Sequence, residues 1–121
     1  MDAQAGADIA VFVVWSDQLG GRESHVPDAM ELMPDPRVRH YWDGDRTVGR
    51  AFRVLDLEDR KIDVETEAWD VYLLFDREAT WDSETPPRAS WWEHQLRIAV
   101  PERRLDARRF AAKAQALRDK P

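Results

Sequence analysis

Three acidic side chains, each one or two positions after a tryptophan, have the clearest chemical potential in this chain. The tryptophans recur at a spacing of 27 residues. These three carboxylates, with His25 or His40 nearby in sequence, could ligate a divalent cation. They could also share a proton, because like charges held close together raise the pKa of one of them. Aspartates in such positions can equally close a turn or cap a helix. The spacing matches no named metal motif, so both uses stay open and no metal or cofactor is predicted. The pairs are Trp15 with Asp17, Trp42 with Asp43, and Trp69 with Asp70.

Nucleophilic catalysis has little support in the sequence. Ser16 would need a positioned base to act as a nucleophile, and no Gly-x-Ser-x-Gly pattern surrounds it. The chain contains no cysteine, which excludes a disulfide, a thiolate metal site and a thiol nucleophile. We therefore predict no catalytic residue, and Ser16 is kept as a candidate for ligand or partner binding.

Two adjacent tryptophans, Trp91 and Trp92, suggest a binding surface. The residues Ser90 to Glu93 match the capping-box pattern and predict a short helix. Neighbouring side chains on a helix point about 100° apart, so one of the two indoles is expected to be half exposed. Such a segment can serve as a lid or an interface, and exposed indoles can bind a flat or apolar ligand or a partner chain.

The hydrophobic patterns place the first two tryptophans at strand ends. Residues 8–15 form a β-branched and aromatic run that predicts a strand buried on both faces, and residues 37–42 predict a second strand. Between them, Glu23–Met33 has the apolar spacing of an amphipathic helix. A second helix is predicted over Arg46–Leu57, with Asp45 as its N-cap.

The remaining segments complete an α/β order. Asp56–Glu67 is polar and acidic, which indicates a surface loop. Trp69–Phe75 predicts another strand, with Ala79–Trp81 as its antiparallel hairpin partner. Leu105–Leu117 predicts a closing helix.

This order resembles the thioredoxin fold, and particular residues add to the likeness. The first strand ends Val13-Val14-Trp15, as thioredoxin-like strands often end directly before Trp-Cys-x-x-Cys, and residues 16–19 occupy the place of that motif. The segment 69–76 is similar to the later strand that follows a cis-proline and runs into a hairpin, although Ala68 stands where that proline is expected. The chain thus looks like the bacterial thioredoxin-like proteins that lack cysteine. Thiol–disulfide exchange cannot be carried over, because it needs two thiols.

The resemblance implies a thioredoxin-like mixed sheet of parallel strands plus an antiparallel hairpin, flanked by helices. It implies a single domain of residues 1–121, with a core at 8–82 and a C-terminal helical segment at 88–118. In such a sheet the three tryptophan and aspartate pairs gather on one rim. We therefore expect a redox-inactive binding or interaction module, with a protein or a small ligand as its partner. Its candidate binding residues are Trp15, Ser16, Asp17, Trp42, Asp43, Trp69, Asp70, Trp91 and Trp92.

Composition narrows the functional classes. The chain has 121 residues, is 43% hydrophobic and carries a net charge of −6, which predicts a globular protein that does not bind nucleic acid. The apolar run near the N-terminus is too short for a membrane span, so a cytoplasmic protein is expected, with a trimmed export signal left open. Two alternatives remain: an enzyme with an acidic site on the same rim, with or without a metal, and a homodimer that pairs through Trp91 and Trp92.

Overall fold

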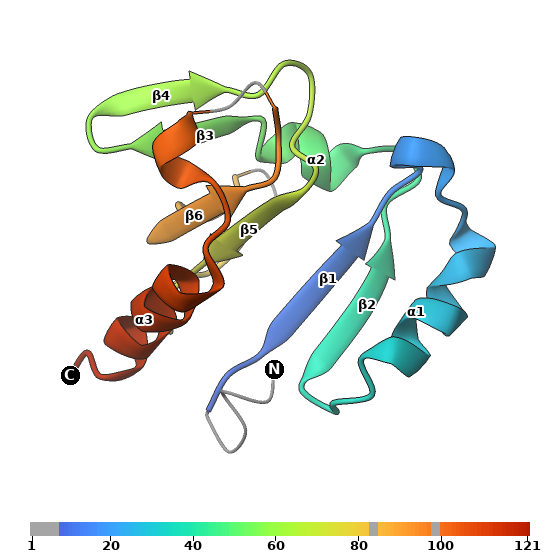
Figure 1. Ribbon diagram of the computed structural model, residues 1–121, viewed down its shortest axis with the longest axis horizontal. Helices are drawn as coiled ribbons and strands as arrows, with labels where there is room; N and C mark the ends of the chain where they lie inside the picture. Colours follow the sequence, from blue (N-terminus) through green and yellow to red (C-terminus); the bar gives the residue numbers. More distant parts are fainter. Residues whose placement is uncertain (1–7, 83–84, 98–99) are drawn as a thin grey trace. The chain divides into compact units, whose positions relative to one another are not determined.

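A computed structural model describes residues 8–82, 85–97 and 100–121. The chain forms two compact units, which divide in the sequence between Val48 and Gly49 (Figure 1). We refer to the part up to Val48 as unit 1 and to the part from Gly49 as unit 2, and we describe each by itself. The expected single domain of residues 1–121 stays a prediction.

Unit 1 contains two parallel strands with a helix between them in the sequence. Strands β1 (Val11–Trp15) and β2 (Val38–Trp42) pair in parallel, and helix α1 (Val26–Leu32) lies beside β2 (Figure 1). This confirms the two predicted strands and the helix between them. The connection from β1 to α1 runs through two short 3₁₀ turns, η2 (Gln18–Gly20) and η3 (Glu23–His25).

The two strands of unit 1 bury alternate side chains. Phe12 and Val14 are 60% and 41% exposed, whereas Val11, Val13 and Trp15 are partly buried. The expectation that the first strand is buried on both faces is therefore wrong. The pattern is that of a strand with one covered face and one open face.

The boundary between the units falls in a short helix. Helix α2 covers only Thr47–Ala51, so the predicted helix Arg46–Leu57 is correct for its first half and wrong for its second. The Asp43 carboxylate accepts hydrogen bonds from the amides of Thr47, at 2.9 Å, and Val48, at 3.0 Å, and so caps the start of the helix. The expectation that Asp45 is its N-cap stays a prediction.

Unit 2 opens with an antiparallel hairpin that was predicted as helix and loop. Strand β3 (Val54–Leu57) pairs with β4 (Arg60–Asp63). Leu55 and Leu57 alternate into the core, with 3% and 6% of their surface exposed, and this two-residue period favours a strand over a helix. The acidic surface loop expected over Asp56–Glu67 is thus largely a hairpin.

The second antiparallel pair also differs from the prediction. Strand β5 (Val71–Leu74) lies within the predicted strand Trp69–Phe75, but its partner is β6 (Trp91–His94) and not Ala79–Trp81. The helix predicted over Ser90–Glu93 is therefore wrong. On a strand, Trp91 and Trp92 point to opposite faces, and Trp92 becomes a central core residue with only 1% exposure.

The C-terminal part packs against β6 through a 3₁₀ turn and the predicted closing helix. Turn η4 spans Pro101–Arg103, and helix α3 spans Ala107–Arg118, with Asp106 as its N-cap. The segment 88–118 is therefore helical only in part, because it also contains β6. The core of unit 2 consists of Leu55, Leu57, Val64, Trp92 and Leu96.

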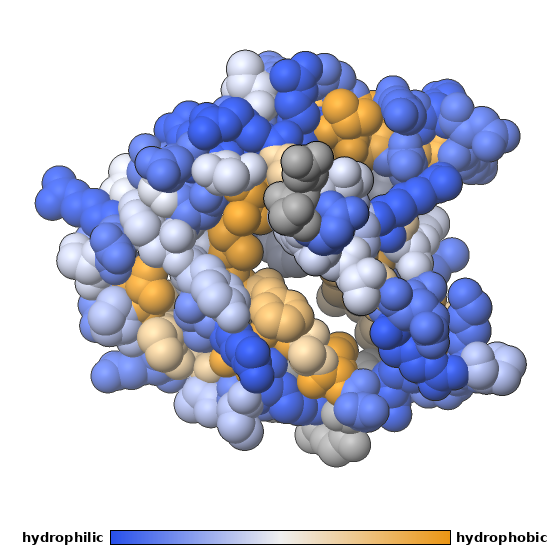
Figure 2. Space-filling model, turned by 180° about the vertical axis from the view of Figure 1, so that it is seen from behind, coloured by the Kyte–Doolittle hydropathy of each residue, from blue (hydrophilic) through white to orange (hydrophobic). Residues whose placement is uncertain are grey.

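The strands within the described ranges form three two-stranded sheets, β1–β2, β3–β4 and β5–β6, and not the single mixed sheet that was expected. The fold is nevertheless a mixture of helices and strands. No peptide bond in these ranges is cis, which includes the bond between Ala68 and Trp69. None of the helices there is both long enough and apolar enough to cross a membrane. The face of the molecule seen in Figure 2 is mainly hydrophilic, with apolar side chains reaching the surface in separate patches.

Candidate functional site

Unit 1 contains a cavity of about 350 Å³ at the carboxyl ends of its two parallel strands. Open α/β sheets usually bind ligands beyond this end of their strands. The wall comes from the two strand ends, the two 3₁₀ turns and the start of α1. The residues that form it are Trp15, Ser16, Gln18, Gly20, Gly21, Arg22, His25, Val26, Ala29 and Trp42.

Two indoles stand next to each other in this wall. The parallel register pairs Trp15 with Trp42, and the amide of Asp43 extends the ladder by donating to the Trp15 carbonyl at 2.6 Å. Both tryptophans are partly buried. The first two of the regularly spaced tryptophans are thus neighbours in the structure, and both line the cavity.

The orientation of Trp15 is fixed by His40. The indole Nε1–H of Trp15 donates to Nδ1 of His40 at 3.0 Å, and the two ring planes differ by only 5°. Because an indole nitrogen can only donate, His40 Nδ1 must be the acceptor, and the neutral ring carries its proton on Nε2. Nε2 is buried and has no hydrogen-bond partner in the part of the chain that the structure describes.

Two glycines, Gly20 and Gly21, determine the path of the loop that lines the cavity. Gly20 has a φ of +79°, a left-handed conformation that glycine adopts without strain. At Gly21 a Cβ atom would lie 2.5 Å from the backbone oxygen of Ser16, so a side chain there would push the loop away from the strand end. The Gly-Gly pair therefore allows the chain to turn back closely beside Ser16.

The polar groups of the wall are basic or neutral. Arg22 and His25 supply a guanidinium and an imidazole, and Ser16 supplies a hydroxyl group. Among the described residues, the Arg22 guanidinium forms no hydrogen bond or ion pair. No aspartate or glutamate belongs to the wall as described.

The two predicted aspartates of unit 1 lie near the strand ends but are occupied by other groups. Asp17 forms an ion pair with Arg46 at 2.8 Å, and this hydrogen bond lowers the pKa of Asp17. Asp43 caps α2, as described above. Within the described ranges, no group of three or more histidine, aspartate or glutamate side chains is placed to hold a metal ion.

The third predicted pair, Trp69 and Asp70, belongs to unit 2. Trp69 packs against the core of that unit. Asp70 has a left-handed φ of +53°, and its carbonyl accepts a hydrogen bond from the amide of Gln95 at 2.9 Å. Both residues therefore have clear structural roles at the start of β5.

No protein-family model, curated protein or solved structure matches this chain. What the site does must therefore be argued from its own residues.

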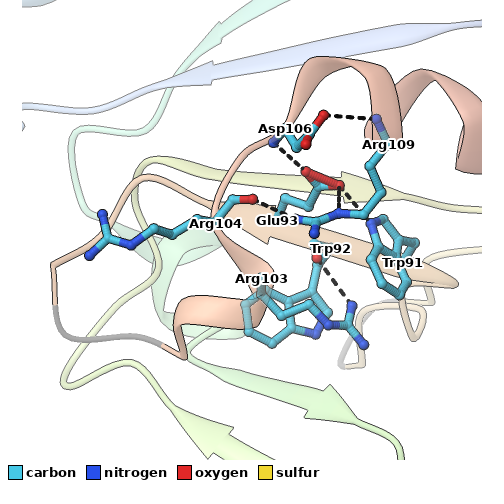
Figure 3. A network of polar contacts seen from close by, with 7 residues as sticks. All are labelled: Trp91, Trp92, Glu93, Arg103, Arg104, Asp106 and Arg109. Atoms are coloured by element: carbon cyan, nitrogen blue, oxygen red, sulfur yellow. Dashed lines mark hydrogen bonds and ion pairs between the residues drawn. The ribbon is translucent and has the colours of Figure 1, made fainter.

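Trp91 and Trp92, the remaining predicted site residues, belong to a network of polar contacts in unit 2 (Figure 3). Its centre is Glu93, whose side chain is fully buried. The Glu93 carboxylate accepts hydrogen bonds from Trp91 Nε1 at 2.8 Å, from the Asp106 amide at 2.7 Å and from Arg109 Nε at 3.3 Å.

Cationic side chains cover the Trp91 ring. The Arg103 guanidinium lies 3.7 Å from the ring centre, and Lys113 Nζ lies 4.1 Å from it. Arg103 is itself buried and donates to the carbonyl of Trp92 at 3.1 Å. These contacts tie β6 to η4 and α3, which indicates a structural role for the network.

His94 completes the buried polar set of β6. Its Nδ1 accepts from the Leu96 amide at 3.0 Å, and its Nε2 lies 2.7 Å from the Val100 carbonyl. Both ring nitrogens are satisfied by the neutral ring. The contrast with His40, whose Nε2 is left without a partner in the described residues, distinguishes the two units.

Unit 2 has a cavity of its own, of about 310 Å³, between β3, β5 and residues 85–89. Three charged residues line it: Asp56 and Arg88, which form an ion pair at 3.1 Å, and Lys61. The cavity of unit 1 differs from it in having two tryptophans and no carboxylate among its described wall residues.

Proposed function

We propose that this protein is a redox-inactive binding module whose unit 1 cavity holds a planar, mainly apolar small molecule against Trp15 and Trp42. The observation that carries the proposal is the cavity itself, which places two neighbouring indoles at the carboxyl ends of parallel strands. Its volume of about 350 Å³ lies within the range of known small-molecule sites. Indole rings offer large, rigid surfaces for stacking.

The absence of cysteine supports the redox-inactive part of the proposal, since disulfide exchange needs thiols. The thioredoxin-like assignment remains part of the proposal. It is supported by the order of β1, α1 and β2 and by the parallel pairing of the two strands.

Two other functions have weaker support. An enzyme with an acidic site at the strand ends would need free carboxylates, but Asp17 is paired with Arg46 and Asp43 caps α2. A homodimer through Trp91 and Trp92 would need exposed indoles, but Trp92 is 1% exposed and cations cover the ring of Trp91.

The expected affinity determines the experiment. Indole has about nine non-hydrogen atoms, and an efficiency of about 0.45 kcal/mol per atom, between the values for very small and drug-sized ligands, gives about 4 kcal/mol, or a Kd of about 1 mM. Ligand-observed NMR detects binding in this range. The probe is indole, titrated against the full chain.

Three variants test the position of the site. Trp42→Ala should weaken indole binding at least about tenfold, because it removes one wall of the cavity. Ala29→Phe should abolish indole binding, because its ring would fill the cavity while both tryptophans remain. The matched control is Trp81→Ala, which removes an indole of unit 2 that is 49% exposed, and it should bind indole like the wild type.

Circular dichroism establishes that each variant is folded. The proposal is wrong if the wild type does not bind indole, or if folded Trp42→Ala and Ala29→Phe variants bind it as tightly as the wild type does.

A further inference from the structure

We infer that the ligand of the unit 1 cavity is an aromatic acid, a planar ring with an anionic substituent. This inference rests on the proposed function and adds the chemical class of the ligand. It is drawn from the charge of the wall, which differs in sign from the charge of the whole chain.

The chain carries a net charge of −6, yet the ionisable side chains described in the cavity wall are Arg22 and His25. Acidic residues adjoin the wall in sequence at Asp17, Glu23, Asp28 and Asp43, but none of them lines the cavity. Asp17 is also paired with Arg46 at 2.8 Å, which offsets its charge locally. The Arg22 guanidinium is thus a fixed positive charge in a wall whose described residues include no carboxylate, and such a wall favours an anion.

The chemistry of Arg22 suits a carboxylate. A guanidinium presents its N–H groups in a planar fork that matches the two oxygens of a carboxylate. The Arg22 side chain is exposed and uses none of these donors on another described residue. Binding an anion therefore requires no existing contact of Arg22 to break.

Further hydrogen-bond donors line the same cavity. They are the Ser16 hydroxyl and the His25 ring. The indole Nε1–H of Trp42 also makes no hydrogen bond within the described residues. An anionic substituent therefore has several donors available in the same wall that holds the two indoles.

Three probes of nearly equal shape separate charge from ring stacking: indole-3-acetate, indole-3-acetamide and tryptamine. They carry a negative charge, no charge and a positive charge at neutral pH. Ligand-observed NMR titrations of the full chain at low ionic strength give the three dissociation constants. We expect indole-3-acetate to bind at least about tenfold more tightly than the amide, and tryptamine to bind more weakly than the amide.

Variants of Arg22 test whether this side chain causes the preference for a negatively charged ligand. Arg22→Gln should reduce the preference for the acid over the amide to less than about threefold, and Arg22→Lys should keep part of it. The matched control is Arg39→Gln, which removes an exposed arginine of β2 that does not line the cavity. It should keep the full preference.

The outcomes distinguish a failure of the aromatic-acid inference from a failure of the proposed binding function. If the amide binds as tightly as the acid, or if Arg22→Gln keeps the full preference, the inference is overturned and the cavity is a site for uncharged aromatic ligands. If none of the three probes and no indole binds, the proposed function itself fails.

Discussion

The tryptophan pair of unit 2, Trp91 and Trp92, and that of unit 1, Trp15 and Trp42, differ in whether the buried polar groups around them have hydrogen-bond partners. Around Trp91 and Trp92, the buried polar atoms of Glu93 and His94 have partners, and Trp92 is part of the core. Around Trp15 and Trp42, His40 keeps a buried nitrogen without a partner in the described residues, and the indoles face a cavity. Satisfied buried groups stabilise a fold, whereas unsatisfied ones cost stability. This difference indicates a structural role for the first pair and supports the proposal that the second pair binds a ligand.

The distribution of the core agrees with this division. The fully buried apolar residues of the described chain all belong to unit 2. The described residues of unit 1 are at most partly buried. Changes in the Trp91 network should therefore act mainly on stability, and changes in the cavity mainly on binding.

The largest expected effect is the loss of the Glu93 carboxylate. Glu93→Ala leaves the indole of Trp91, the amide of Asp106 and the Arg109 side chain without their buried acceptor. We expect a loss of about 3–5 kcal/mol in the free energy of unfolding, measured by urea denaturation.

The control is Glu102→Ala, which breaks an exposed pair with Arg60 at 3.4 Å and should cost less than about 1 kcal/mol. Equal losses in the two variants would contradict the structural role of the Glu93 network.

Acid should weaken the same network. Burial raises the pKa of Glu93, but hydrogen bonds from Trp91, Asp106 and Arg109 outweigh it and hold the pKa below the ordinary glutamate value. The folded state then binds fewer protons than the unfolded state. The stabilisation is complete above the ordinary pKa and is lost as the pH falls through the folded-state pKa.

Urea midpoints of the wild type and Glu93→Gln, measured from neutral pH into the acid range, report this loss. The wild type should be the more stable protein at neutral pH, and the difference should shrink in acid. Parallel curves would show that Glu93 does not contribute to the pH dependence.

A moderate effect is expected at the loop of unit 1. Gly21→Ala places a Cβ 2.5 Å from the Ser16 oxygen and should cost about 1–3 kcal/mol while reducing indole affinity, because the loop must move. Gly20→Asn is the comparison, since asparagine tolerates the left-handed φ and no atom lies within 4 Å of the added Cβ. If the Asn variant loses more affinity than the Ala variant, the packing argument for Gly21 is wrong.

The smallest effect is expected at Asp17. Its ion pair with Arg46 is solvent-exposed, so Asp17→Asn should leave the melting temperature unchanged within error, at low and at high salt. Indole affinity should also be unchanged, because Asp17 does not line the cavity. A marked loss of indole affinity in this variant would show that Asp17 contributes to ligand binding.

The sequence predicted the elements whose signals are local. The apolar run of β1, the amphipathic helix α1 and the closing helix α3 were all predicted. The hairpin β3–β4 was missed because Ala51 and Leu55 fit a helical period, whereas burial of Leu55 and Leu57 in the unit 2 core decided for a strand. Such burial depends on residues far away in the sequence.

Strand β6 was missed for a similar reason. Ser90 and Glu93 match a capping box, but Glu93 accepts its hydrogen bonds from its strand neighbour Trp91 and from residues of the C-terminal part. Within the candidate site, Trp15, Ser16 and Trp42 were predicted. Arg22 was missed because the cavity exists only once α1 folds beside β2, and its place directly after Gly20-Gly21 was the available signal. His25 was considered only as a neighbour of a possible cation site, and the structure places it in the cavity wall.

The central claim is that Trp15 and Trp42 bind a ligand, whereas Trp91 and Trp92 do not. The most direct test follows the six indole N–H signals of ¹⁵N-labelled protein, assigned with single Trp→Phe variants, while unlabelled indole is added. We predict saturable shifts of the Trp15 and Trp42 signals, with those of Trp91 and Trp92 unchanged. Shifts of the Trp91 and Trp92 signals without any change at Trp15 and Trp42 would contradict the account.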